Sequence, residues 1–162
     1  MRKALLFAVL VLAAAGIGVS AGHGYNNSAP TFECITCHVG DMAPDMVRIE
    51  GIPKAYAPGR VYQLTVVVAG GQQSLGEVAG GFAVVASAGE LIVRDKRNTQ
   101  ISEAIVTHTQ QGSRLRKWAF AWKAPAQKTT AAISVMAMAA NGDFSPAGDQ
   151  VGSTVYTIKP AQ

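Results

Sequence analysis

Alternation of apolar with polar or small residues dominates the chain from residue 56 onward and constrains its fold more than any other feature. In 117–123, Trp118, Phe120 and Trp122 fall on one face of an extended chain, because successive strand residues point to opposite sides. Stretches with this period, separated by Gly, Pro, Asn and Asp, are typical of short strands joined by turns. The expected strands are 61–68, 81–87, 91–94, 101–109, 117–123, 131–140 and 153–158.

The same region lacks any helical signal. No stretch after residue 50 has the 3.6-residue apolar period of an amphipathic helix of three turns. The pattern therefore predicts an all-β fold, an antiparallel immunoglobulin-like β-sandwich over 53–162. Within 131–140 it places Met136 and Met138 on the face opposite to Ile133.

The first 21 residues are expected to be a signal peptide. Basic Arg2 and Lys3 precede an apolar and small-residue run from Ala4 to Val19, and 19–21 fits a small-x-small cleavage site. The alternative is an uncleaved anchor, but a run of 16 residues is shorter than the roughly 20 that span a bilayer. We therefore expect an exported protein, periplasmic or at the cell surface, with no membrane span after cleavage.

Charge argues against nucleic acid as a partner. The chain has 14 Lys and Arg against 10 Asp and Glu, a net charge of +4. Loss of Arg2 and Lys3 with the signal would leave 12 against 10, a net charge of +2. No basic run is interleaved with aromatic residues, as nucleic-acid binding would require.

The sequence Cys34-Ile35-Thr36-Cys37-His38 has the spacing that attaches c-type haem. Two thiols at this separation add to the two vinyl groups of one porphyrin, and the following histidine ligates the iron. We therefore predict one covalent haem c, with Cys34 and Cys37 as thioether anchors and His38 as proximal ligand. A redox-active disulfide and half of a zinc site remain as alternatives, although the chain has no second cysteine pair for zinc. A short, irregular haem-binding segment would then occupy 22–52, ahead of the sandwich.

Several short sequence motifs after residue 52 occur in a specific order: Pro53 with Tyr56–Gly59, then Gly81–Phe82, Val106–Thr109, Trp118–Pro125 and Ala139–Asp143. In this order they resemble the reeler domain, the β-sandwich of the reelin N-terminus and of insect defence proteins. They resemble more closely a group of bacterial exported proteins labelled choice-of-anchor V. These bacterial relatives often carry a Cys-x-x-Cys-His segment before the sandwich, whereas the animal versions carry additional cysteines. The resemblance implies a reeler-like fold with attached haem and says little about role.

The sixth ligand of the iron is open, because several side chains could supply it. Histidine as the second ligand gives a low potential, and methionine raises it. We expect His108 first, because it ends a predicted strand beside a turn from which an imidazole could project outward. Reeler relatives without haem carry a histidine in the motif that corresponds to Val106–Thr109, which favours a structural role for His108 instead. The other candidates are His23, Met42, Met46, Met136 and Met138, of which His23 and Met46 are the preferred alternatives.

The sequence therefore predicts a monohaem electron carrier in the periplasm or at the cell surface, with redox proteins as partners. The alternative is an adhesion or assembly module whose sandwich docks other copies of itself, as a homo-oligomer or filament with haem as relay. A haem enzyme would need a distal acid–base pair, and none stands out. A serine hydrolase is not supported, because no nucleophile-elbow motif occurs.

Overall fold

The computed structural model describes residues 27–29, 32, 34, 43–70, 73–145 and 147–162. The signal-peptide prediction falls outside these ranges, and within them no helix is long and apolar enough to cross a bilayer. The strands are β1 (Val47–Glu50), β2 (Ala55–Tyr56), β3 (Val61–Val68), β4 (Gly80–Ala86), β5 (Glu90–Val93), β6 (Thr99–Ser102), β7 (Ile105–His108), β8 (Lys117–Lys123), β9 (Ala131–Ala139) and β10 (Gln150–Pro160). Short 3-10 turns lie at Pro44–Met46 (η2) and Gly112–Arg114 (η3).

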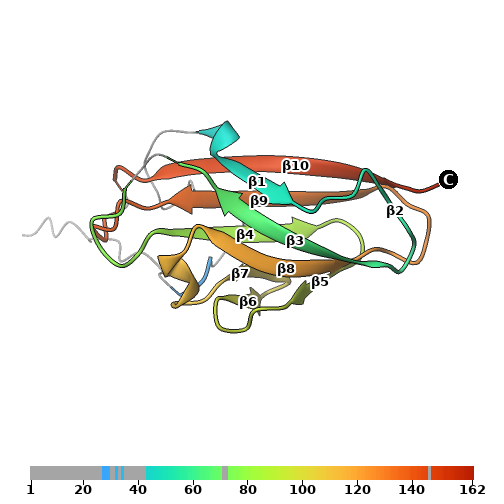
Figure 1. The fold of residues 1–162 in the computed structure, drawn as a ribbon, viewed down its shortest axis with the longest axis horizontal. Helices are drawn as coiled ribbons and strands as arrows, with labels where there is room; N and C mark the ends of the chain where they lie inside the picture. Colours follow the sequence, from blue (N-terminus) through green and yellow to red (C-terminus); the bar gives the residue numbers. More distant parts are fainter. Residues whose placement is uncertain (1–26, 30–31, 33, 35–42, 71–72, 146) are drawn as a thin grey trace, which may run out of the picture.

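Two sheets face each other and confirm the predicted all-β sandwich (Figure 1). The four-stranded sheet has the order β1-β3-β8-β5, and the six-stranded sheet has the order β2-β10-β9-β4-β7-β6. Neighbouring strands are antiparallel except for the short parallel pair of β2 with β10. Strands β3, β4, β5, β8 and β9 lie within a residue of their predicted ranges.

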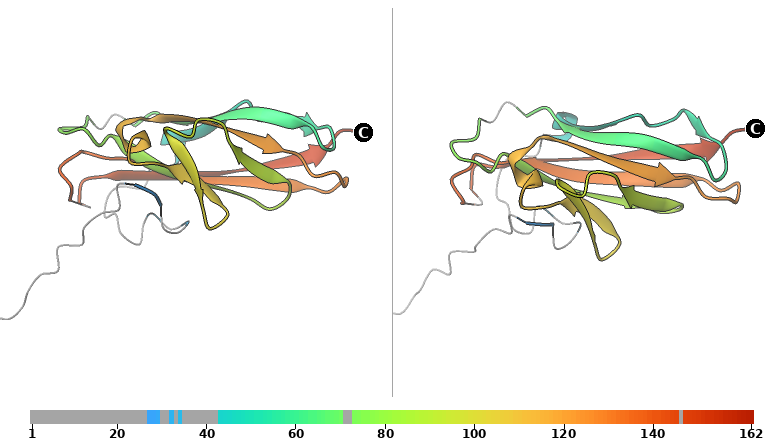
Figure 2. Two further views of the ribbon diagram at one scale, coloured as in Figure 1. Left: turned by 90° about the horizontal axis from the view of Figure 1, so that it is seen from below. Right: turned by 60° about the horizontal axis from the view of Figure 1, so that its bottom comes forward.

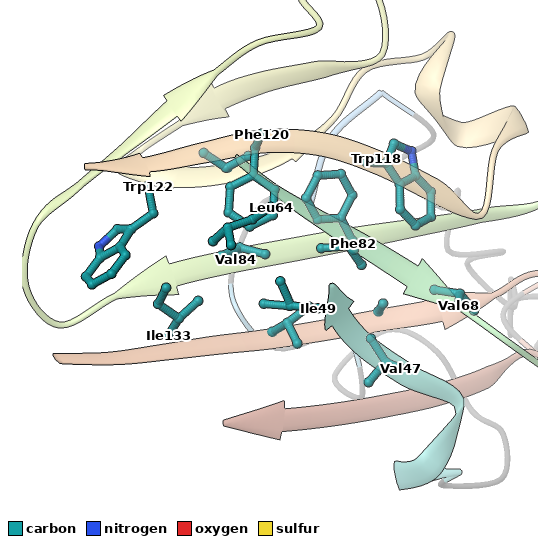
Figure 3. Packing of buried hydrophobic residues seen from close by; sticks show 14 of the residues in the cluster. Val47, Ile49, Leu64, Val68, Phe82, Val84, Trp118, Phe120, Trp122 and Ile133 are labelled. Atoms are coloured by element: carbon teal, nitrogen blue, oxygen red, sulfur yellow. The ribbon is translucent and has the colours of Figure 1, made fainter. Parts of the chain in front are cut away.

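The core forms where the inward faces of both sheets meet, and the aromatic row of β8 is its centre (Figure 3). Trp118, Phe120 and Trp122 are each at most 1% exposed. Trp118 stacks on Phe82 of β4 with 4.8 Å between ring centroids, so the two sheets are joined by an aromatic pair. Tyr56 meets Trp122 edge to face at 5.6 Å and closes the other end of the core.

Strand β1 lies inside 22–52, the range predicted to be an irregular haem-binding segment. It pairs with β3 over Val47–Glu50, and its burial alternates, with Val47 and Ile49 inward and Arg48 and Glu50 outward. This alternation spans only four residues between Pro44 and Pro53, which is too short to indicate a strand in the sequence. The sandwich therefore begins before residue 53.

The single strand expected over 101–109 is wrong, because this part of the chain forms the hairpin of β6 and β7. Ser102 pairs with Ile105, so the loop has two residues, Glu103 and Ala104, with φ of 46° and 66°. Tight hairpin loops of this kind usually use Asn or Gly for positive φ. Neither residue is present here, so the turn had no signal in the sequence.

Candidate haem-attachment site

The outer face of the six-stranded sheet carries the described residues of the N-terminal segment. Ala29 donates its backbone N–H to Oγ1 of Thr107 on β7 at 3.0 Å. The backbone oxygen of Asn27 accepts a hydrogen bond from Nε2 of Gln100 on β6. Figure 2 shows this piece beneath the sheet, on the side away from β3 and β8. The segment that leads into the Cys-x-x-Cys-His motif thus lies against the sandwich.

Cys34 lies further across the same sheet, over β9. Its backbone N–H points to Sδ of Met136 at 3.2 Å, a contact between residues 102 positions apart in the chain. Its side chain packs against an apolar group that we call the outer cluster. The outer cluster consists of Val78, Met136, Met138, Ala140 and Val151.

The alternation of β9 explains why two methionines meet the cysteine. Its residues Val135 and Ala137 point into the core, so Met136 and Met138 point outward, as the sequence predicted. Beside them, β4 presents only Gly81 opposite Met138 and Ala83 opposite Met136. The absence of a side chain at Gly81 leaves room for the imidazole of His108, which lies against this position on the same face.

Burial varies along the outer face and identifies the end at which the segment docks. On β10, Val151 is 1% exposed, whereas Val155, four residues along on the same side, is 62% exposed. Thr107 and Ala83, which are paired across β7 and β4, are fully buried although they face outward. An outward face is buried only where something covers it, so this end of the sheet is a docking surface.

The surroundings of Cys34 fit a haem group. Haem has a broad apolar ring, and the outer cluster supplies an apolar floor with two thioether sulfurs beside the anchoring cysteine. Cys37 and His38, the second anchor and proximal ligand, fall outside the described residues. Among the described residues, no group of three His, Cys, Asp or Glu could hold a bare metal ion.

His108, the first choice for the sixth ligand, is buried at the end of β7 and is 4% exposed. Its Nδ1 accepts the backbone N–H of Phe82 at 3.2 Å, and its ring lies against the outward side of Gly81, so the imidazole is on the outer face of the six-stranded sheet but is covered there. A neutral imidazole that accepts at Nδ1 carries its proton on Nε2. Ligation through Nε2 would require that proton to move and the bond from Phe82 to break. Ligation by His108 stays a prediction that this geometry disfavours.

Met46, an alternative sixth ligand, packs in the core between the sheets and is 6% exposed. It lies beside Gly152, where an added Cβ would come within 2.9 Å of its Cγ. Gly152 faces inward, and the preceding Val151 faces the outer cluster. Met46 and Cys34 therefore lie on opposite faces of the six-stranded sheet. The other alternative, His23, falls outside the described residues.

Arg116 ties together the loops beside the outer cluster, a role that the sequence did not show. Its guanidinium donates to the backbone oxygens of Gly70, Ala79 and Ala140 at 2.8, 3.1 and 3.4 Å. Burial lowers the pKa of this guanidinium from its ordinary value, although an arginine remains charged at neutral pH. The sandwich therefore holds a fixed positive charge next to Ala140 of the outer cluster.

Comparison with known proteins supports the fold and no more. No protein-family model and no curated protein matches the chain. The crystal structure of the reelin-N domain of F-spondin matches with a TM-score of 0.55 and 20% identity, over 80% of this chain and 96% of that domain. The human F-spondin reeler domain (fragment 1) matches with a TM-score of 0.53 and 19% identity, over 75% of this chain and 95% of that one. The fold is reeler-like.

Proposed function

We propose that this protein is an exported monohaem c-type cytochrome that carries electrons in the periplasm or at the cell surface. The observation that carries the proposal is the placement of Cys34. The first anchor of a haem-attachment motif rests on an apolar, sulfur-bearing face of a rigid sandwich. A motif that occurred by chance would have no reason to meet such a surface.

Each part of the chain has a separate task in this proposal. Cys34 and Cys37 hold the group through thioether bonds, and His38 supplies an axial nitrogen. The haem, when attached, supplies a centre that gains and loses one electron. The outer cluster excludes water from one side, and the charge of Arg116 lies nearby, so both act on the reduction potential. Nothing in this scheme requires a substrate or an acid–base pair, so we assign no enzymatic activity.

A reversible redox titration tests this function. The protein is produced in a host with haem-ligation machinery, and its absorption is followed while the potential is stepped down and then up. We expect a single one-electron wave that retraces itself. The matched control replaces both cysteines, Cys34→Ser with Cys37→Ser, and should show no wave. Irreversible reduction, or turnover of a haem substrate such as peroxide at an enzyme's rate, would contradict the carrier role.

The rival function, an assembly module that polymerises with haem as relay, predicts a different molecular size. The exposed Val155 on β10 and Ile101 on β6 are separated by three strands, whereas the exposed Leu75 and Phe144 lie on two loops that a hydrogen bond from Leu75 N–H to Asn141 O joins. Single exposed apolar residues such as Val155 and Ile101 are ordinary on monomeric surfaces. Sedimentation of the haem-loaded protein separates the two, because filaments would appear under the rival function alone.

A further inference from the structure

Three loops lie at one end of the sandwich, away from the C-terminus (Figure 1). They connect β3 to β4, β7 to β8 and β9 to β10. They enclose a hollow of about 490 Å³, a volume that is common for small-molecule sites. Its lining residues come from all three loops: Gly76, Glu77, Val78, Gln110, Arg114 and Phe144. Loops on a rigid sheet are a frequent place for binding residues.

Phe144 is held in solvent at a cost in backbone energy. It is 72% exposed and has a φ of 62°, a left-handed conformation that phenylalanine rarely adopts. Such strain persists only where the surroundings impose it, and it is common at ligand-binding sites. The carboxylate of Asp143 contributes to it by accepting hydrogen bonds from the Asn141 side-chain amide at 2.9 Å and from the backbone N–H of Ser145 at 2.7 Å. The loop therefore presents an aromatic residue to the hollow instead of burying it.

The β9–β10 loop is also fixed to the β3–β4 loop. The backbone N–H of Leu75 donates to the backbone oxygen of Asn141 at 2.7 Å. Gly76 and Gly142 lie so close together that a Cβ on Gly76 would be 2.7 Å from the backbone oxygen of Gly142. A side chain at Gly76 would therefore push the two loops apart. The hollow is formed before any ligand binds, which lowers the entropy cost of binding.

The hollow also contains two charged side chains in a defined arrangement. Nη2 of Arg114 donates to Oε2 of Glu77 at 2.6 Å, and this ion pair joins the β7–β8 loop to the β3–β4 loop. Both side chains are at least half exposed, and one hydrogen bond uses only part of what a guanidinium can donate and a carboxylate can accept. The pair thus offers both donors and acceptors to a ligand.

This combination of groups indicates the class of ligand. An apolar peptide or a second copy of the chain would need an apolar surface, but only Val78 and Phe144 among the lining residues have apolar side chains. The charges of Glu77 and Arg114 cancel, so the hollow does not favour an anion. A neutral sugar fits both parts of the lining. Its ring hydrogens carry partial positive charge and can stack on the negative face of an aromatic ring, and its hydroxyl groups both donate and accept hydrogen bonds.

We infer that this hollow binds a neutral saccharide, with Phe144 stacked on one sugar ring and with Arg114 and Glu77 hydrogen-bonded to its hydroxyl groups. The site does not require haem, although Val78 also belongs to the outer cluster. On an exported carrier, such a site would hold the protein on a polysaccharide at or near the cell surface.

An array of neutral oligosaccharides built from glucose, mannose, galactose, xylose and N-acetylglucosamine tests the inference with the labelled mature protein. Calorimetry then measures the affinity for the saccharide that binds best. Phe144→Ala should weaken this affinity about tenfold, because it removes the stacking surface, and Arg114→Ala should have a similar effect. The matched control is Leu75→Ala, which removes an 85% exposed side chain that does not line the hollow. It should bind like the parent.

Phe144→Gly separates binding from folding. Glycine adopts positive φ without strain, so this variant should lose affinity as Phe144→Ala does and melt at least as high as the parent. A large loss of stability in Phe144→Gly would assign the ring a structural role and overturn the inference.

Binding to no saccharide of the array would also overturn the inference. Equal losses in Leu75→Ala and Phe144→Ala would overturn it as well, because they would indicate a general apolar contact. The double variant Cys34→Ser, Cys37→Ser should bind like the parent. Failure of the haem proposal and failure of the saccharide inference are therefore distinguishable.

Discussion

At the scale of single residues, the buried imidazole of His108 takes the place of a backbone acceptor at the end of the ladder between β4 and β7. Its Nδ1 takes the backbone N–H of Phe82, and Oγ1 of Thr107 donates to the backbone oxygen of the same residue at 2.6 Å. The two side chains satisfy β4 backbone groups at the end of its ladder with β7. A buried backbone group without a partner costs free energy, which explains a histidine at this position.

We expect His108→Ala to lower the free energy of unfolding by about 1–3 kcal/mol, because it leaves the Phe82 N–H buried without an acceptor. The absorption spectrum of the haem-loaded variant should stay low-spin if the role of this imidazole is structural. Urea denaturation and absorption of the haem-loaded variant measure the two effects. The control is Gln110→Ala, an exposed position two residues along. Full stability together with a high-spin spectrum would show that the imidazole ligates the iron.

Only the part of the candidate site that is formed by consecutive residues could be predicted from the sequence. The spacing of Cys34, Cys37 and His38 is a feature of five consecutive residues and is visible without a fold. The contact between Cys34 and Met136 joins residues 102 positions apart. The alternation of β9 placed Met136 on the outward face, but it gave no indication of which segment covers that face.

At the scale of elements, β1 connects the N-terminal segment to the sandwich. It follows η2 directly, pairs with β3 at the edge of the four-stranded sheet, and buries Val47 and Ile49 in the core (Figure 3). A fragment that starts at residue 54 would lose these contacts and expose the edge of β3. The β-sandwich that the sequence predicts over 53–162 therefore begins earlier, because it includes β1.

We predict that 43–162 folds without haem and unfolds cooperatively in urea, and that 54–162 is much less stable. Each buried Val or Ile contributes about 1.5–3 kcal/mol, which is a large share of a domain's total of about 5–15 kcal/mol. Chemical-shift dispersion and the urea midpoint of both fragments measure the difference. Equal midpoints would mean that β1 contributes nothing to the core, contrary to its burial.

The elements that could be predicted are those with long alternation. Strands β3, β8 and β9 have seven to nine residues, which is long enough for a period of two to be visible in the sequence, so their ranges were close to right. The two-residue strand β2 and the hairpin loop at Glu103 and Ala104 depend on tertiary pairing. A turn with φ of 46° and 66° at residues that do not favour it is imposed by the surrounding sheet.

At the scale of the whole molecule, the protein is a sandwich with two unlike outer faces. The described N-terminal residues Asn27 and Ala29 lie against one end of the six-stranded sheet (Figure 2), and Cys34 contacts the outer cluster. The sandwich has its own aromatic core, so we expect it to fold without haem. Under the proposed function, it would act as a preformed wall for the haem, in contrast to small cytochromes whose helices wrap around theirs.

The central claim is that Cys34 and Cys37 bind one haem covalently, and intact mass of the acid-denatured protein tests it most directly. The protein is made in a host with haem-ligation machinery, and the double variant Cys34→Ser, Cys37→Ser is the control. The account predicts that the parent keeps the polypeptide mass plus one haem after denaturation, and that the control shows polypeptide alone. A parent at polypeptide mass, with free thiols or a disulfide, would contradict it.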